Sequence, residues 1–164
     1  MELVDGENLR DMWPTLSEEE KEHLCGEAGT MVRALRRLAR LTGETFIGTM
    51  GGQPLNDRVF QQYPEFSLPY NDPFVFTHAD LSLCNIMVTR RQPNVPLRIA
   101  AIIDWEQSGW LPLSWEPYKA RASEESDEKI RYLATITGDI DDDVYLALDT
   151  FVMSLGGFES NYHP

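Results

Sequence analysis

Two short stretches of the sequence carry side chains suited to proton transfer and metal binding. FTHADLSLCNIMV contains His78, Asp80 and Asn85 directly after an apolar run, and IIDWE ends a second apolar run with Asp104. A carboxylate can orient a hydroxyl group and accept its proton, while a second carboxylate and an amide oxygen form an all-oxygen site of the kind that Mg²⁺ prefers. These residue types therefore point to acid–base chemistry, a magnesium site, or both.

Three β-prone runs must position these side chains. They cover residues 74–77, 86–89 and 97–103, and RRQPNVP supplies turn residues between the last two. This pattern predicts a hairpin-like ribbon over residues 74–104. In such a ribbon the loop after the first run and the strand end at Asp104 emerge on the same side, so we expect the two carboxylates and the amide to meet there.

Helices are expected before and after the ribbon in the sequence. Ser17 and Glu20 form a capping-box pattern, and apolar residues recur at helical spacing until Gly43, which predicts a helix over residues 17–42. Residues 114–164 are also predicted to be helical, and an acidic run within them is interpreted as helix capping rather than a metal site. The two helices of this C-terminal part are expected near residues 115–135 and 141–155.

The segment between the first helix and the ribbon resists regular structure. Residues 44–73 are rich in Gly and Pro, with scattered aromatic residues. We therefore expect an ordered loop or a lid over this range.

Composition limits the classes of partner. The 164 residues, 42% of them hydrophobic, suffice for one core and predict a single domain over residues 1–164. A net charge of -13 repels phosphate backbones, so nucleic acid is not expected as a partner. No apolar run approaches the roughly 18 residues of a membrane span. Two distant cysteines, Cys25 and Cys84, without a secretory segment favour the cytoplasm, and Cys84 is interpreted as a small buried thiol rather than a nucleophile.

Around these motifs the sequence resembles a known family. HADLSLCNIMV followed by IAAIIDWEQSGWLPLSWEPYKA is similar to the aminoglycoside phosphotransferase and choline kinase-like family, especially its fungal members, in which Asp-Trp-Glu replaces the Asp-Phe-Gly of protein kinases. The similarity begins at MELVDGENLRDMW, which resembles a hinge segment, and extends to about Arg121. It implies an α+β, mainly α fold: the C-terminal lobe of a protein-kinase-like fold, with residues 1–14 as the hinge-like segment and a small β-ribbon carrying the catalytic loop.

The resemblance also implies roles for individual residues. Asp80 corresponds to the catalytic base, Asn85 and Asp104 to the metal ligands, and His78 to a residue that braces the loop. Apart from the resemblance, Glu106 and Glu116 are each either a cation contact or a helix-start carboxylate, and Glu106 is a candidate for cofactor binding. Four aromatic residues either line a substrate pocket or anchor the following helix on the core. They are Trp105, Trp110, Trp115 and Tyr118.

Departures from the family pattern affect the expected activity. Ala79 stands where the family usually has Gly, which restricts the backbone between His78 and Asp80. Because the sequence begins at the hinge, we expect the N-terminal lobe to be missing, together with its phosphate-covering loop and phosphate-binding Lys. Phosphoryl transfer depends on positioning and charge stabilisation, so losing these elements should lower its rate by orders of magnitude.

Three functions remain open. The leading hypothesis is a small-molecule enzyme that reuses the catalytic cleft of the phosphotransferase-like fold for acid–base chemistry without ATP. Its substrate would be a metabolic intermediate, secondary metabolites included. The proton would be moved by His78, Asp80, Asp104 or Glu106, and no cofactor would be required. The alternatives are an ATP- and Mg²⁺-dependent phosphotransferase whose nucleotide site is completed by a partner, and a noncatalytic binding or regulatory module. Apolar surface uncovered by the missing lobe further predicts a homodimer or a lipophilic ligand.

Overall fold

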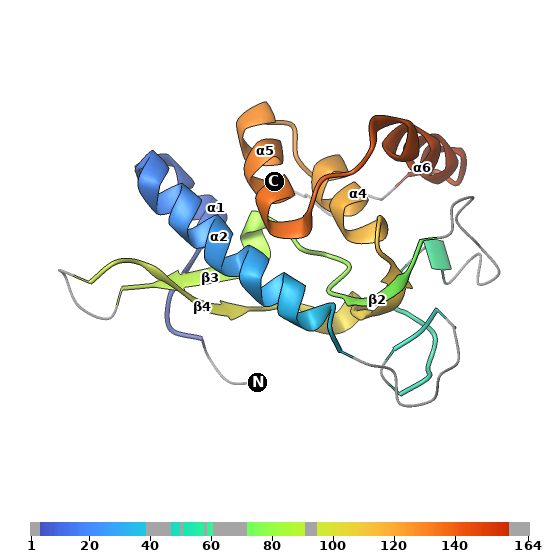
Figure 1. The fold of residues 1–164 in the computed structure, drawn as a ribbon, viewed down its shortest axis with the longest axis horizontal. Coiled ribbons are helices and arrows are strands. Elements are labelled where there is room, and N and C mark those ends of the chain that lie inside the picture. The colour runs from blue at the N-terminus through green and yellow to red at the C-terminus, as the bar shows by residue number, and fades with distance from the viewer. Residues whose placement is uncertain are drawn as a thin grey trace.

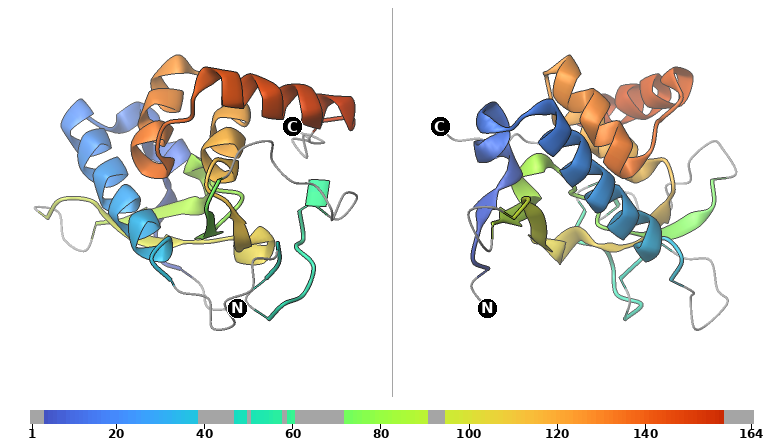
Figure 2. Two further views of the ribbon diagram at one scale, coloured as in Figure 1. Left: turned by 45° about the vertical axis from the view of Figure 1, so that its right-hand side comes forward. Right: turned by 60° about the vertical axis from the view of Figure 1, so that its left-hand side comes forward.

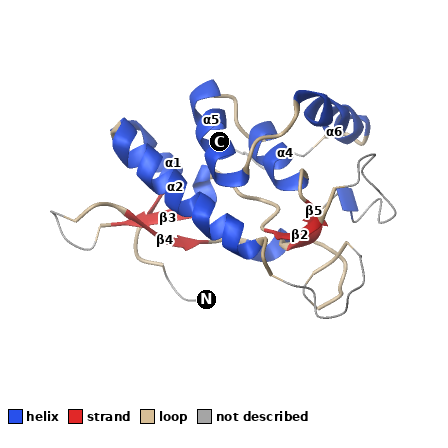
Figure 3. Ribbon diagram, viewed as in Figure 1, coloured by secondary structure: helices blue, strands red, loops and turns tan. Residues whose placement is uncertain are grey.

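The protein is described by a computed structural model that covers residues 4–38, 47–49, 51–57, 59–60, 72–90 and 95–157. Within these ranges, helices lie over two small antiparallel sheets (Figure 1). Figure 3 shows the strands of both sheets beneath the helices. The α+β class expected from the sequence is confirmed. None of the helices in the described ranges combines the length and apolarity that a membrane crossing needs.

The first sheet contains the expected hairpin. β3 (Ile86–Thr89) pairs antiparallel with β4 (Arg98–Ile102), and the short strand β1 (Glu7–Asn8) pairs with the other edge of β3. Side chains alternate between the two faces of a strand, and accordingly Ile86 and Val88 are buried on one face of β3. The hairpin therefore places the end of β4 next to the start of β3, and Asp104 follows two residues after β4.

The second sheet differs from the predicted ribbon. β2 (Phe74–Thr77) pairs antiparallel with β5 (Gly109–Pro112), a strand that the sequence patterns did not identify, and not with β3 or β4. All four residues of β5 are buried. Phe76 and Trp110 are opposite each other in register and pack edge to face with ring centroids 5.6 Å apart. Such cross-strand aromatic pairs stabilise a sheet, which explains why β2 selects β5.

The N-terminal part contains α1 (Leu9–Met12) and the 3-10 turn η1 (Trp13–Thr15), which begin inside the segment 1–14 predicted to be hinge-like and end one residue beyond it. α2 (Glu18–Leu35) follows, and the predicted capping box is present at its start. The Ser17 hydroxyl accepts the Glu20 amide at 3.2 Å, while the Glu20 carboxylate accepts the Ser17 amide at 3.0 Å.

The predicted end of this helix is wrong. α2 ends at Leu35, several residues before the expected end at residue 42, and the region 39–46 around Gly43 lies outside the described residues. The prediction relied on a stripe of apolar residues, and the later members of this stripe are exposed. Met31 is 37% exposed, and Leu38, beyond the end of α2, is 45% exposed. Most of the predicted lid, residues 44–73, also falls outside the described residues.

Three helices make up the C-terminal part: α4 (Trp115–Ala122), α5 (Asp127–Thr137) and α6 (Asp142–Ser154). The single helix expected near residues 115–135 is therefore two, because the chain turns after α4 and Ser126 caps α5. Asp141 caps α6 by accepting the amides of Asp143 and Val144, which confirms the capping interpretation of this acidic run. Figure 2 shows α6 lying above α4.

The core consists of two clusters that meet at the segment between β2 and β3. One cluster joins α2, the first sheet and α5, and the other joins β5, α4 and α6. The β2–β3 segment places Ala79 in the second cluster, and it places Leu81 and Leu83 in the first. The loop that carries Asp80 is thus fixed by apolar packing on both sides.

Candidate functional site

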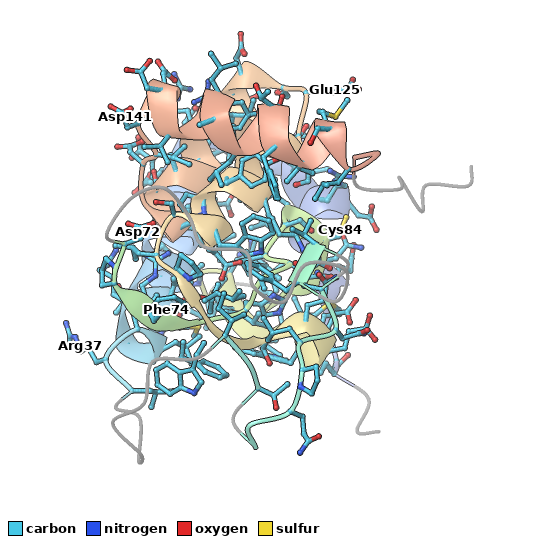
Figure 4. All side chains as sticks on the ribbon, turned by 90° about the vertical axis from the view of Figure 1, so that its right-hand side faces the viewer. Arg37, Asp72, Phe74, Cys84, Glu125 and Asp141 are labelled. Carbon is cyan, nitrogen blue, oxygen red and sulfur yellow. The ribbon has the colours of Figure 1, made fainter. Side chains whose placement is uncertain are left out.

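The loop around Asp80 is anchored by a buried carboxylate. Glu116, in the first turn of α4 and only 2% exposed, accepts hydrogen bonds from the backbone N–H groups of three loop residues. The distances are 2.8 Å to His78, 3.2 Å to Ala79 and 3.2 Å to Leu81. Three N–H donors satisfy this buried carboxylate, so Glu116 serves as the anchor of this loop. The start of α4 is itself tied to the segment just before β2, because Asp72 (Figure 4) accepts the Ser114 amide at 2.9 Å.

His78 braces the loop, as the resemblance implied. Its Nδ1 accepts the amide of Asp80 at 3.2 Å, so Nε2 carries the proton and donates to the carbonyl oxygen of Ile103 at 2.8 Å. The ring is 2% exposed and packs edge to face on Trp105. Both ring nitrogens are therefore engaged in the protein's own backbone, and the structure gives no support to proton transfer by His78.

The backbone on either side of the site takes a rare conformation. Ala79 has φ 67° and Asp104 has φ 65°, and these two are the non-glycine residues with positive φ in the described ranges. The left-handed region costs roughly 1–2 kcal/mol for a residue with a side chain. A glycine would adopt the backbone angles of Ala79 without this cost, and Ala79 adjoins Asp80, while Asp104 is itself one of the candidate site residues.

Asp80 and Asn85 form one hydrogen-bonded unit. The Asn85 Nδ2 group donates to the carbonyl oxygen of Asp80 at 2.7 Å and to its carboxylate at 3.3 Å. The backbone carbonyl of Asn85 also accepts the Ile103 amide at 2.9 Å, which ties the loop to the residue before Asp104. Two motifs that are separated in the sequence therefore meet, as the sequence predicted.

Burial dominates the electrostatics of Asp80. The carboxyl group is half-buried, and this burial raises the pKa of Asp80 above its ordinary value. The positive charge of Lys119 and the hydrogen bond from Asn85 oppose the rise, while the negative charge of Asp104 adds to it. Asp80 and Asp104 are close enough to interact, although they come from different motifs.

The oxygen donors of this site suit a hard cation. Because Asn85 uses Nδ2 to bind Asp80, its Oδ1 is the atom left to a ligand, and the exposed carboxylate of Asp104 makes no capping bond to its own turn. Two carboxylates and an amide oxygen fit Mg²⁺ by charge and ligand type. The described residues contain no group of three or more His, Cys, Asp or Glu side chains placed to hold a metal, and the present set differs because it includes an amide.

The aromatic residues proposed for a substrate pocket are mostly in the core. Trp115 and Tyr118 are 0% exposed and Trp110 is 7% exposed, so these three pack the protein interior. Trp105, in the turn η3 (Trp105–Gln107), is 36% exposed beside His78. Glu106 in the same turn is exposed.

Three further polar residues lie near the site and were missed in the sequence. Lys119 of α4 binds Gln107 of η3 at 2.6 Å and the buried carboxylate of Asp57 at 3.1 Å. A sequence signal was available, because Lys119 follows Glu116 by three residues and so shares its helix face. Asp57 and Gln107 carry no such signal, since their partners are far away in the chain.

Comparison with protein-family models and with curated proteins finds no match for this sequence.

Proposed function

We propose that this site transfers a phosphoryl group to a hydroxyl of a small molecule, with Asp80 as the general base and with Asn85 and Asp104 as magnesium ligands. The observation that carries the proposal is the double hydrogen bond from the Asn85 amide to Asp80. This bond holds the base and the amide ligand in one unit and leaves the Asn85 side-chain oxygen to a ligand, while the Asn85 backbone carbonyl accepts the amide of Ile103, the residue before Asp104. The combination of roles is that of a kinase-type catalytic loop.

In this proposal Asp80 orients the acceptor hydroxyl and takes its proton as the oxygen attacks the terminal phosphorus of ATP; the bond from that phosphorus to the bridging oxygen breaks, and ADP leaves. Magnesium, when bound, supplies neutralisation of the charge on the phosphates. Glu116 and His78 do not touch the substrate; they hold the loop through backbone groups, so that Asp80 needs little reorganisation. A net charge of -13 disfavours a polyphosphate on its own, and the proposal therefore includes a partner that completes the nucleotide site.

A second candidate is the ATP-independent proton transfer expected from the sequence. The exposed ring of Trp105 favours it, because an apolar surface next to Asp104 suits an apolar metabolic intermediate. Asp80 would then take a proton from an acidic C–H group and return it to another atom of the same molecule. This reaction requires no cofactor.

Calorimetric titration distinguishes the two candidates. Mg²⁺ is titrated first, then ATP with Mg²⁺, into the wild-type protein, the Asp104→Asn variant and a control, Glu125→Gln, which alters an exposed carboxylate outside the site. The phosphotransfer proposal expects saturable Mg²⁺ binding that weakens at least tenfold in Asp104→Asn and is unchanged in the control. Equal Mg²⁺ affinity in all three proteins would rule it out and leave proton transfer as the remaining candidate.

A further inference from the structure

Lys119 connects three segments that surround the candidate site. It belongs to α4, and its ammonium group contacts the Gln107 side-chain oxygen at 2.6 Å and the Asp57 carboxylate at 3.1 Å. The side chain of Lys119 is 11% exposed and that of Asp57 is 1% exposed. An ion pair this deeply buried is costly to form and is retained only where its geometry is well satisfied.

Both carboxylate oxygens of Asp57 accept hydrogen bonds. One carboxylate oxygen accepts the Val59 amide at 3.0 Å, and the other accepts the indole N–H of Trp115 at 3.2 Å in addition to Lys119. Trp115 belongs to the same helix as Lys119 and is 0% exposed. Asp57 is therefore a rigid anchor for the ammonium group.

The contact of Lys119 with Gln107 restrains the turn η3, which directly follows Asp104. In this turn the Ser108 amide donates to the Trp105 carbonyl at 3.0 Å, and the indole of Trp105 donates to the Ile102 carbonyl at 2.7 Å. Asp104 itself has left-handed backbone angles. Such a strained residue persists only where its surroundings fix it, and the Lys119–Gln107 contact is one such constraint.

We propose that Lys119 is a positioning residue that sets the direction of the Asp104 carboxylate, by clamping the turn at Gln107 to the buried anchor Asp57. The inference rests on the proposed function for the role of Asp104, but the clamp itself is a property of the fold. Sequence patterns gave no indication of it, because Asp57 and Gln107 lie 62 and 12 residues from Lys119.

The sign of the effect on Mg²⁺ binding separates a positioning role from a purely electrostatic one. Removing a positive charge near a cation site strengthens cation binding if charge alone matters. Loss of the clamp weakens binding, because Asp104 is no longer held in place. The two roles thus predict opposite changes in the dissociation constant.

The experiment compares Asp57→Asn with the double variant Asp57→Asn/Lys119→Met. Lys119→Met alone leaves the Asp57 carboxylate buried without its counter-ion and is expected to unfold, whereas the double variant removes both charges. Asp57→Asn is the matched control: the Lys119 ammonium keeps its contact to Gln107, and at 11% exposure it is less isolated from water than the 1% exposed Asp57 carboxylate would be in Lys119→Met. Magnesium affinity is measured by calorimetry, and hydrogen exchange of the Ser108 amide is measured without metal.

The expected result is Mg²⁺ binding at least tenfold weaker in the double variant than in Asp57→Asn, with at least tenfold faster exchange at Ser108. Unchanged or tighter Mg²⁺ binding together with unchanged exchange would overturn the inference. If neither protein binds Mg²⁺, the proposed function fails, and the exchange rate of Ser108 alone decides whether Lys119 is a clamp.

Discussion

The carboxylate of Glu116 lies 2.8 Å from the backbone nitrogen of His78, a residue 38 positions earlier in the chain. Through this contact and two similar ones, the first turn of α4 determines the path of the loop that carries Asp80. The catalytic candidate is thus held mainly by backbone hydrogen bonds to one side chain. The geometry of the site depends on the docking of α4 as well as on the motif itself.

Replacing Glu116 with Gln should destabilise the protein. The amide keeps the size of the side chain, but it loses the charge and presents N–H groups toward buried N–H donors. We expect a loss of about 3 kcal/mol in the free energy of unfolding, measured by urea denaturation. Glu125→Gln, at an exposed position, is the control and should change stability by less than about 0.5 kcal/mol. Equal stability of the two variants would contradict an anchoring role for Glu116.

The crossing of α2 and α5 predicts opposite effects for two glycines of the same helix. A Cβ atom on Gly29 would lie 2.7 Å from the Thr135 carbonyl oxygen, which is backbone and cannot easily move, whereas nothing lies within 4 Å of a Cβ on Gly26. Gly29→Ala should therefore destabilise by about 1–3 kcal/mol. Gly26→Ala should stabilise by about 0.5–1 kcal/mol, because alanine is the better helix former. Thermal unfolding of both variants checks the pair, and shifts of the same sign would contradict the predicted helix contact.

The sequence patterns predicted the features that depend on residues close together in the sequence. The Ser17 capping box, the β3–β4 hairpin and the contact of Asn85 with Asp80 and with Ile103 all follow from residues close together in the sequence or joined by one hairpin. The pairing of β2 with β5 did not follow, because the choice of partner depends on Phe76 meeting Trp110 across the sheet.

The supporting residues of the site were harder to predict than its central ones. Glu116 was recognised as a carboxylate near a helix start, and its three backbone partners become visible only once the loop is folded against α4. Lys119 and Asp57 are 62 residues apart in the sequence and form an ion pair only in the folded structure. Our proposal ranks phosphotransfer ahead of ATP-independent chemistry, the reverse of the order inferred from the sequence.

The two cysteines should differ in reactivity. Cys25 is 0% exposed, and burial raises the pKa of its thiol to about 12, so very little thiolate forms near neutral pH. Cys84, beside Asn85, is half-buried, which modifies the expectation of a buried thiol at this position. Iodoacetamide should label Cys84 and spare Cys25 in the folded protein, and it should label both in concentrated urea. Mass spectrometry of the peptides checks this, with Cys84→Ser as the control; native labelling of Cys25 would show that the core opens.

Asp80→Asn should remove activity and at the same time raise stability at neutral pH. Burial raises the pKa of Asp80, so the folded state holds the proton more tightly than the unfolded state, and ionisation of the carboxyl group opposes folding. The stability from this proton is fully present below the unfolded-state pKa and is lost as the pH rises through the higher folded-state pKa. Asparagine has no charge to bury, so the variant should gain melting temperature over the wild type as the pH rises from about 4 to 7.

Thermal scans across this pH range test the linkage, with Asp5→Asn, an exposed aspartate, as the control whose difference from the wild type should stay flat. A site that sacrifices stability for chemistry is expected where a carboxylate is kept half-buried next to a second one, Asp104. If Asp80→Asn instead melts below the wild type at neutral pH, the carboxylate stabilises the loop through its bond to Asn85. Asp80 would then be a structural residue, and its conversion to Asn could no longer separate catalysis from folding.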